Sequence, residues 1–405
     1  MTTVSTETLV LNEESIPSYL AERADAIGVF PPNAILTAKP ITGGNVNFAF
    51  CVSNTVENGS NSPDVRTAVF VKQAPEYVAI FGPGAYPLTS ERMQMEIDVY
   101  KEWMQVDGVS QYLPQIYLFD PVHMATVMQF LDGYELLDHL LIKKEHKEGF
   151  FNKAATQLGD FMGKTHGATH SSKMAPDRVA YLVEHFENRP MRDIQLEFVF
   201  TKCFKEATDE QRAGLTVDER FMKEVALIKA QYNGEVGTEN LVLSHGDLHP
   251  GSVMANPDTE EVKVIDPEFT VYGPPGLDVG SLLSGFVLAA IHHAYSNDTD
   301  EVASICDAVQ TVWDSYTTAI HEYGVSPELV KEIESQAVGF TTIEVCRTAL
   351  EFAGGRLWLQ FDDATVKAKA KRAALELVSK CMIDRHEGGI QLLIKEMKSL
   401  ADYVG

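Results

Sequence analysis

The predominant spacing of apolar residues changes near residue 135 of this chain, and the change limits the folds that the chain can adopt. Before that point, short runs of alternating apolar and polar residues are bounded by Gly, Pro, Asn and Asp, as is typical of β-strands. We expect strands within residues 35–54, 66–74 and 113–131, and helices at 15–28 and 88–105. After it, helical spacing predominates, and we expect helices at 148–170, 217–232, 277–296, 300–323, 326–354 and 364–402.

This pattern predicts an α+β protein with two lobes. The N-terminal lobe (residues 1–133) is expected to contain an antiparallel β-sheet and one main helix, and the larger C-terminal lobe (residues 134–405) to be mostly helical. A length of 405 residues also favours two or more domains over a single core.

Composition excludes several classes of protein. A net charge of −25 argues against a nucleic-acid partner, because such binding requires Lys and Arg to neutralise phosphates. The five cysteines are scattered without a C-x-x-C pair, which indicates neither a zinc site nor a disulfide framework. No apolar run approaches 18 residues, and residues 1–15 lack the pattern of a secretory signal. We therefore expect a cytoplasmic protein without a membrane partner.

A histidine, an aspartate and a second histidine follow the apolar run 241–243, in the sequence LVLSHGDLHPGSVMA (residues 241–255). The run predicts a short buried strand, and Pro250 and Gly251 predict the turn after it. Polar groups at a strand end are held by the scaffold and often face a cleft. Asp247 is therefore a candidate catalytic group, although a loop that merely caps a turn would also fit these residues.

A hairpin closed by residues 256–258 is expected next, and its second strand ends at Asp266 and Glu268. We expect strands around 241–247 and 261–269 to pair as a small β-ribbon within the helical lobe, which would bring the three carboxylates together. Crowded carboxylates repel one another unless a cation lies among them. With oxygen ligands and no cysteine, Mg²⁺ is the cation that this set favours.

The N-terminal lobe contains two further features. ITGGNVNFAF (residues 41–50) predicts a strand, a glycine turn and a strand, and paired glycines let backbone N–H groups approach a phosphate. VFVKQA places Lys72 among apolar neighbours, where it could pair with Glu96 of the following helix and with a ligand phosphate. Each feature alone is also typical of an ordinary hairpin or surface residue. Together with a carboxylate base and a Mg²⁺ site, they are the components of phosphoryl transfer.

The order of these elements is that of the small-molecule branch of the protein-kinase-like fold, which includes the aminoglycoside and choline kinases. More closely, the chain resembles the 5-methylthioribose kinases. GGNVNFAF is similar to that family's G-D-G-N-L-N turn, FVKQAPEYV to its V-K-Q-A-x-x-Y strand, and HGDLHPGSV to its H-G-D-L-H-T-G-S loop. DPEFTVYGPPGLDVG is similar to its D-P-E-F-A-x-x-G-P-x-x-F-D-x-G segment, and the matches extend from about residue 40 to residue 355.

The resemblance implies that Asp247 is the catalytic base, which orients the acceptor hydroxyl and takes its proton. Asp266 and Glu268 would bind Mg²⁺, with Ser252 as a weaker ligand. Asp278 would hold the catalytic loop through its backbone N–H groups.

The resemblance also implies an ATP site in the N-terminal lobe. A glycine turn would cover the phosphates, a lysine–glutamate pair would contact them, and a hinge would face the adenine. These positions are Gly43, Gly44, Asn45, Asn47, Lys72, Glu96, Gln129 and Leu131. His245 and His249 are expected to fix the catalytic loop and not to bind metal.

The acceptor side departs from the family. There, a late F-A-G turn is followed by two adjacent arginines, and here these positions are Leu359 and Gln360, in EFAGGRLWLQFDD. Two lost guanidiniums would remove charge-assisted hydrogen bonds of about 1.5–3 kcal/mol each. Either Arg347 or Arg356 replaces them, with Trp358 adding bulk nearby, or the acceptor is different. Pro250 also stands where the family has Thr, which removes a hydroxyl and a backbone N–H.

Three functions remain open at this point. The first is an ATP- and Mg²⁺-dependent kinase that phosphorylates the primary hydroxyl of 5-methylthioribose or a close analogue, within methionine salvage. The second is the same chemistry on another small alcohol, a different pentose or an amino alcohol, which the missing arginine pair favours. The third is a nucleotide-binding pseudokinase. A homodimer is also open, because the apolar helix 326–354 could pack against a second copy or within its own chain.

Overall fold

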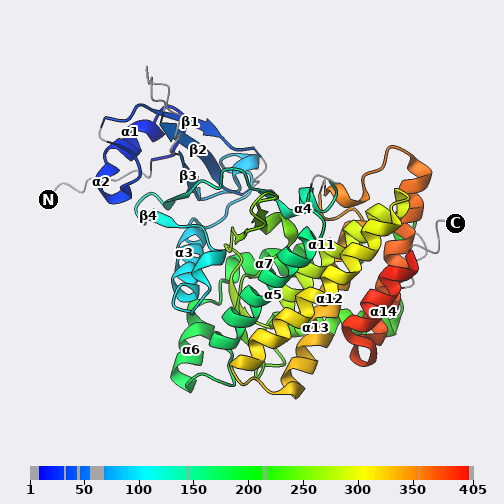
Figure 1. Cartoon of the computed structure of the whole chain (residues 1–405). Coiled ribbons are helices and arrows are strands. Elements are labelled where there is room, and N and C mark those ends of the chain that lie inside the picture. Colours follow the sequence, from blue (N-terminus) through cyan, green and yellow to red (C-terminus); the bar gives the residue numbers. More distant parts are fainter. Residues whose placement is uncertain are drawn as a thin grey trace. The chain divides into compact units, whose positions relative to one another are not determined.

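The computed structural model divides into two compact units (Figure 1). The first comprises residues 1–101 and 113–132, and the second comprises residues 102–112 and 133–405. Within them, the structure describes residues 9–31, 33–42, 46–54, 68–143, 146–212, 215, 217–354 and 356–400. The expected turn residues Gly43, Gly44 and Asn45 lie outside the described residues.

The first unit is built on a five-stranded antiparallel sheet with the strand order β1-β2-β3-β5-β4. Its strands are β1 (Leu36–Pro40), β2 (Phe48–Asn54), β3 (Ala68–Gln73), β4 (Ile116–Asp120) and β5 (Ala125–Gln129). Alternate residues of neighbouring strands, including Val52, Val69 and Val71, are buried against α1 (Ile16–Ala21) and α2 (Ala24–Ile27). The helix α3 (Arg92–Trp103) follows β3 along the chain, so the expected sheet and main helix are confirmed.

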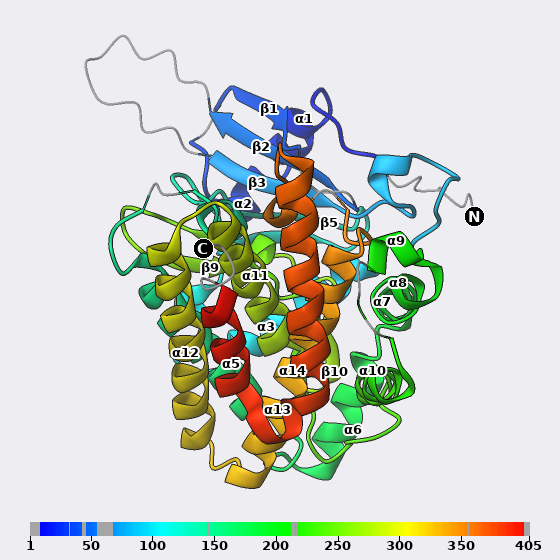
Figure 2. The same cartoon turned by 90° about the vertical axis from the view of Figure 1, so that its right-hand side faces the viewer.

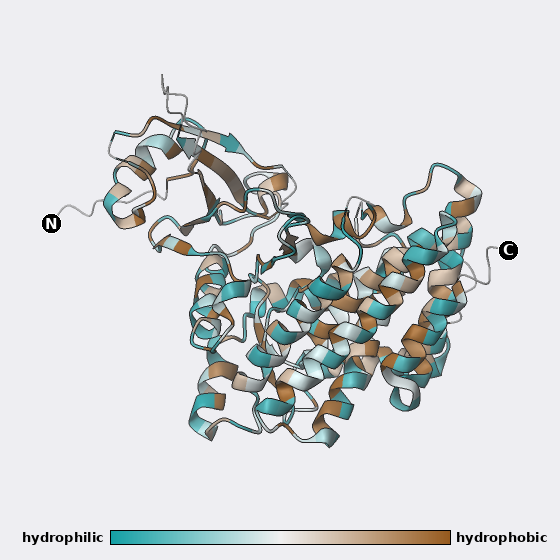
Figure 3. Ribbon diagram, viewed as in Figure 1, coloured by the Kyte–Doolittle hydropathy of each residue, from teal (hydrophilic) through white to brown (hydrophobic). Residues whose placement is uncertain are grey.

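The second unit is mostly helical, as expected. Its helices are α4 (Leu137–Leu140), α5 (Phe150–Thr169), α6 (Pro176–His185), α7 (Arg189–Phe198), α8 (Lys202–Glu206), α9 (Asp209–Arg212), α10 (Glu219–Tyr232), α11 (Gly276–Tyr295), α12 (Thr299–Glu322), α13 (Pro327–Ala349) and α14 (Ala364–Ser399). Figure 1 shows α5 beside α12, and α12 is amphipathic, with one face buried and hydrophilic positions on the other (Figure 3).

The helix α11 lies at the centre of this unit. It is long and apolar enough to cross a membrane, but 94% of its most apolar 18-residue stretch is buried inside the protein. It packs closely on α13, because a side chain at Gly280 would lie 2.5 Å from the Ala337 carbonyl oxygen. This contact fixes the N-terminal part of α11, which carries Asp278.

The last helix is not the single helix expected over residues 364–402. Gly389 has φ +51° and ψ −147°, and the chain turns back there, from orange to red in Figure 2. Glu334 of α13 accepts a hydrogen bond from the backbone N–H of Ile390 at 3.0 Å, which stabilises the turn.

The expected β-ribbon needs a correction. The hairpin is confirmed, since β8 (Val253–Ala255) pairs with β9 (Val262–Val264), and β6 (Glu135–Leu136) flanks it. However, β7 (Val242–Ser244) pairs with β10 (Val271–Gly273) and not with β9. The reason is local, because Asp266 has a left-handed backbone (φ +65°) that turns the chain after β9 and returns residues 271–273 alongside β7.

Candidate active site

The loop after β7 is held by a single buried carboxylate. The backbone N–H groups of His245 and Gly246 donate to Asp278 Oδ2 and Oδ1 at 2.7 and 2.9 Å. His166 Nε2 also lies 3.1 Å from Asp278 Oδ2, and both of these side chains are buried. Gly246 is required at its position, because it has φ +88° and a Cβ there would lie 1.9 Å from the Phe269 carbonyl oxygen. The expected bracing role of Asp278 is thus confirmed.

We predict that Asp278→Asn lowers the free energy of unfolding by about 2–4 kcal/mol, because an amide –NH₂ would face one of two buried N–H donors. Urea unfolding would measure the change, and Asp362→Asn, at an exposed position, is the control. Equal stabilities of the Asp278 and Asp362 variants would contradict the bracing role.

Both histidines of the loop serve its conformation, as expected. His245 Nε2 donates to the Ile265 carbonyl at 2.9 Å, which leaves Nδ1 to accept from the backbone N–H of Asp247 at 3.3 Å. His249 Nδ1 accepts from the Gly251 N–H at 2.9 Å, and burial lowers the pKa of His249 to about 3. His249 is therefore a neutral hydrogen-bond acceptor at physiological pH.

Asp247 lies at the centre of this loop, with about 30% of its side chain exposed. Desolvation and, to a lesser extent, the nearby Glu344 raise the pKa of its carboxyl to about 6, although Arg356 and Arg347 act in the opposite direction. A carboxylate with such a pKa is ionised at neutral pH and is a stronger base than an exposed aspartate.

The pKa of Asp247 gives a predicted pH profile. Because the base acts when ionised, kcat/KM should rise with pH up to about 6 and then level off. Arg356→Ala should move the midpoint to higher pH, and Glu344→Gln should move it to lower pH, since the two neighbours act with opposite sign on Asp247. A pH–rate series on the three proteins measures this, and shifts in the same direction would contradict the assignment.

Two arginines meet one carboxylate beside Asp247. Arg347 Nη2 donates to Glu344 Oε2 at 2.9 Å, and Arg356 Nη2 lies 3.8 Å from the same oxygen. Burial alone would raise the pKa of Glu344, but the two guanidiniums outweigh it and hold the pKa below its ordinary value. Sequence reasoning missed Glu344, although its position three residues before Arg347 on a helix is a usable signal.

The two positions that carry arginines in the resembling family are occupied here by Leu359 and Gln360. Leu359 is buried, and Gln360 is exposed and donates to the Arg356 carbonyl at 3.2 Å. Trp358, expected near the substrate, is 2% exposed and its carbonyl accepts from His292 Nδ1 at 3.0 Å. The described structure thus brings Arg347 and Arg356 toward Asp247 and leaves Trp358 within the core.

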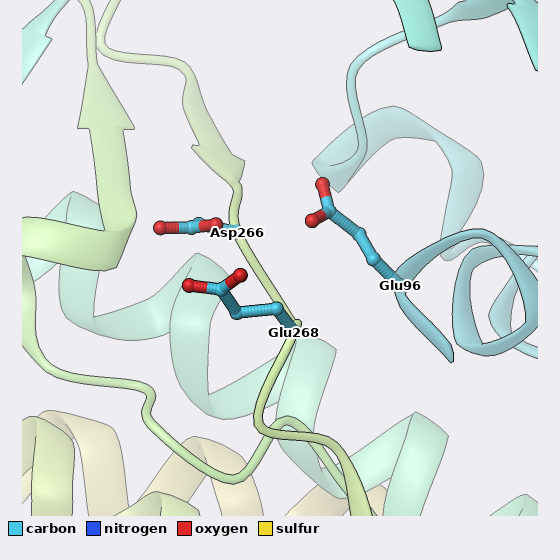
Figure 4. A group of neighbouring side chains, drawn as sticks. All are labelled: Glu96, Asp266 and Glu268. Atoms are coloured by element: carbon cyan, nitrogen blue, oxygen red, sulfur yellow. The ribbon is translucent and has the colours of Figure 1, made fainter. Parts of the chain in front are cut away.

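The two carboxylates of the D-x-E segment lie together between β9 and β10 (Figure 4). Asp266 is exposed and Glu268 is buried, and a carboxylate oxygen of each lies within 4.8 Å of the other. Such a pair of oxygen ligands suits a Mg²⁺ ion, which would offset their repulsion. Ser252 is buried nearby in the loop, and its hydroxyl donates to the Asp247 carbonyl at 2.9 Å.

The helix α7 connects the catalytic loop to the D-x-E segment, a role that the sequence did not indicate. Gln195 Nε2 donates to the Gly246 carbonyl at 2.8 Å. At the start of the helix, Asn188 Nδ2 donates to the carbonyls of Glu268 and Thr270, both at 2.9 Å. Gln195 also lines a small recess together with Glu344, so the segment 187–200 lies beside the candidate acceptor side.

In the first unit, Lys72 Nζ lies 2.5 Å from Glu96 Oε2, and both side chains are buried. This is the expected pair, and Figure 4 also labels Glu96, on α3. Asn47 Oδ1 accepts from Nε of Arg92, which is fully buried and also donates to the Val46 carbonyl. The sequence did not indicate a role for Arg92. Its side chain links residues 46 and 47, just before β2, to α3.

The expected hinge positions lie at and just after the end of β5. The backbone N–H of Gln129 donates to the Gln115 carbonyl at 2.7 Å, and Leu131 is half-buried two residues after β5 ends. The Gln129 N–H is thus already paired within the sheet, and the hinge role of these two positions stays a prediction.

Comparison with known proteins identifies the class. The model of the phosphotransferase enzyme family (APH) matches residues 65–305, and the chain belongs to this family. It is a phosphotransferase that acts on an alcohol group, and kinase membership implies ATP as the phosphoryl donor.

Two relatives illustrate the similarity over nearly the whole chain. Methylthioribose kinase of Geobacillus thermodenitrificans is 28% identical over 382 residues, which cover 89% of this chain and 90% of that protein. Methylthioribose kinase of Bacillus velezensis is 28% identical, with 85% of each chain covered. Among solved structures, Plasmodium vivax ethanolamine kinase aligns with a TM-score of 0.45 and 13% identity, over 92% of this chain and 91% of its own.

Proposed function

We propose that this protein is an ATP- and Mg²⁺-dependent kinase of a small neutral sugar, 5-methylthioribose or a close analogue, and that it acts in methionine salvage in the cytoplasm. The first unit would bind ATP through Lys72, Asn47 and the turn at residues 43–45, with the hinge at Gln129 and Leu131 facing the adenine. The second unit would supply the base Asp247 and the Mg²⁺ ligands Asp266 and Glu268. The similarity to methylthioribose kinases along both units supports this assignment.

The observation that carries the acceptor assignment is the set formed by Glu344, Arg347 and Arg356 beside Asp247. Its one carboxylate is already paired with two guanidiniums, so an ammonium group would meet two like charges there. This disfavours an amino alcohol and favours a neutral polyhydroxy acceptor. Among the described residues, Arg347 Nε and Asp138 Oδ1 are buried without a hydrogen-bond partner, and Asp138 lies close enough to Arg356 to affect its pKa. A sugar hydroxyl that reached them would satisfy one donor and one acceptor.

The chemistry of the substrate changes one expectation from the sequence. In 5-methylthioribose the methylthio group occupies carbon 5, where ribose has its primary hydroxyl, so that sugar has no primary hydroxyl to phosphorylate. The hemiacetal hydroxyl at carbon 1 is more acidic than the secondary hydroxyls, and it is the one whose proton a carboxylate base takes most readily. We therefore assign phosphorylation to the anomeric hydroxyl.

A different pentose remains the second candidate, because Leu359 is buried and Gln360 carries no charge where the relatives' motif has arginines. ADP release with ATP and Mg²⁺ would be compared for 5-methylthioribose, ribose, other pentoses, choline and ethanolamine. The proposal requires the highest kcat/KM for methylthioribose. Preference for ribose would support the second candidate, and turnover of ethanolamine or choline alone would overturn both.

We expect Arg347→Ala and Arg356→Ala each to raise KM for the acceptor about tenfold or more, with little change in KM for ATP, because each removes a charge-assisted hydrogen bond to the sugar. Initial rates at varied sugar and varied ATP separate the two constants. Arg372→Ala, at an exposed pair on α14, is the matched control. An unchanged acceptor KM in both variants would exclude these arginines from the acceptor site.

A further inference from the structure

The second unit contains a cavity of about 370 Å³ between α10, α13 and α14. None of the catalytic, metal-binding or acceptor residues assigned above lines it. Its volume lies at the lower end of the range for small-molecule sites. Its walls consist of polar and charged side chains, with no apolar side chain among the lining residues, so an occupant would be small and polar throughout.

Two buried polar atoms of the lining residues have no hydrogen-bond partner within the described part of the chain. They are Gln231 Oε1, an acceptor, and Arg385 Nε, a donor, and Arg385 is only 2% exposed. Buried polar groups in folded proteins are nearly always hydrogen-bonded, so Gln231 and Arg385 are side chains of the cavity wall with hydrogen-bonding capacity left over. Each unpaired atom is itself covered, so a ligand in the cavity would reach it after a small rearrangement of these side chains.

The charges of the lining residues are balanced. Glu328 and Glu332 provide two carboxylates, and Lys331 and Arg385 provide two cations. Arg385 is already paired with Glu224, whereas Lys331 forms no ion pair within the described part of the chain. A ligand that carries one charge of each sign would therefore pair its carboxylate with Lys331 and its ammonium group with the glutamates.

The cavity wall is hydrogen-bonded to both segments that hold the catalytic loop. Glu332 Oε2 accepts from Asn240 Nδ2 at 3.3 Å, and Asn240 lies two residues before β7. Gln336 Oε1 accepts from the backbone N–H of Gly276 at 3.4 Å, at the start of α11 and two residues before Asp278. A ligand that orders Glu332 and Gln336 would therefore also order the frame of the loop.

We propose that this cavity binds a small polar zwitterion, an α-amino acid with a short side chain, and that the bound ligand stiffens the catalytic loop. Calorimetric titration of the full chain with glycine and serine would measure binding directly, with acetate and ethylamine as probes that carry one charge each. We expect only the zwitterions to bind, and binding of acetate or ethylamine with equal affinity, or of no probe, would overturn the proposal.

Two variants locate the site. Lys331→Ala, at an exposed position, should raise the Kd about tenfold, and Lys395→Ala, an exposed lysine on α14 outside the cavity, should leave it unchanged. Ser335→Gln, which fills the cavity from α13, should abolish binding without unfolding the chain. Unchanged binding in Lys331→Ala or Ser335→Gln would place the ligand elsewhere and overturn the assignment.

Hydrogen exchange tests the coupling without depending on any acceptor. Saturating ligand should slow exchange of the backbone amides in residues 241–252 about threefold or more in the wild type, and not in Ser335→Gln, which should not bind it. Binding without slower exchange in this segment would contradict the coupling.

Discussion

Asp247→Asn is expected to lower kcat about a thousandfold, because it removes the only group in the catalytic loop that can take the acceptor's proton. His245 and His249 cannot substitute for it, since both use Nδ1 as an acceptor for loop N–H groups and His249 stays neutral. KM for ATP should change little. Initial rates of ADP release at saturating ATP measure the effect, and Asp258→Asn, in the exposed turn of the β8–β9 hairpin, is the control.

The same variant should be more stable than the wild type at neutral pH. The folded-state pKa of about 6 lies above the ordinary value of 3.8, so ionisation of Asp247 opposes folding. The wild-type free energy of unfolding therefore falls as the pH rises from about 4 to about 6, by about 1–3 kcal/mol from this group, and the Asn variant lacks this fall. Lower activity with a higher Tm separates loss of the base from misfolding, whereas a less stable variant would contradict the burial of this charge.

Asp266→Asn and Glu268→Gln are expected to lower kcat about a hundredfold or more, and to raise the Mg²⁺ concentration for half-maximal activity about tenfold or more. Each change replaces an anionic ligand by a neutral amide and weakens the hold on the ion.

The readout for this prediction is a Mg²⁺ titration of the initial rate at fixed total ATP. Glu261→Gln, on the exposed end of the same hairpin, controls for a general effect of removing a carboxylate. Wild-type Mg²⁺ dependence in both variants would show that the D-x-E segment does not bind the metal.

Much of the fold could be predicted because it depends on local pattern. The strands of the first unit and the long helices of the second have the spacing that one buried face requires, and Lys72 and Glu96 could be paired from their positions alone. The kink at Gly389 and the pairing of β7 with β10 were not predicted. Each of these two features depends on one residue with a positive φ, Gly389 for the kink and Asp266 for the strand pairing. Sequence patterns do not indicate a positive φ at an aspartate such as Asp266.

The candidate site could likewise be predicted only in part. The loop, its brace Asp278 and the D-x-E segment are contiguous motifs, so short stretches of sequence sufficed to predict the bracing contacts and the proximity of Asp266 and Glu268. Gln195 could not, since it reaches the catalytic loop from a helix distant in sequence and carries no motif. Glu344 carries only a weak signal, its spacing of three residues from Arg347 on one helix. The acceptor site of such a fold is assembled by tertiary packing of residues distant in sequence. The sequence motifs of the family therefore indicate an ATP site more directly than a sugar site.

In the proposed reaction, Asp247 directs a phosphoryl group from ATP to the anomeric hydroxyl of a neutral sugar. The most direct test is phosphorus NMR of the product formed from 5-methylthioribose, ATP and Mg²⁺, with and without coupling to the anomeric proton. We predict one new phosphate ester that is coupled to that proton and absent with Asp247→Asn. Transfer to another hydroxyl, or release of inorganic phosphate with no sugar ester, would contradict the claim.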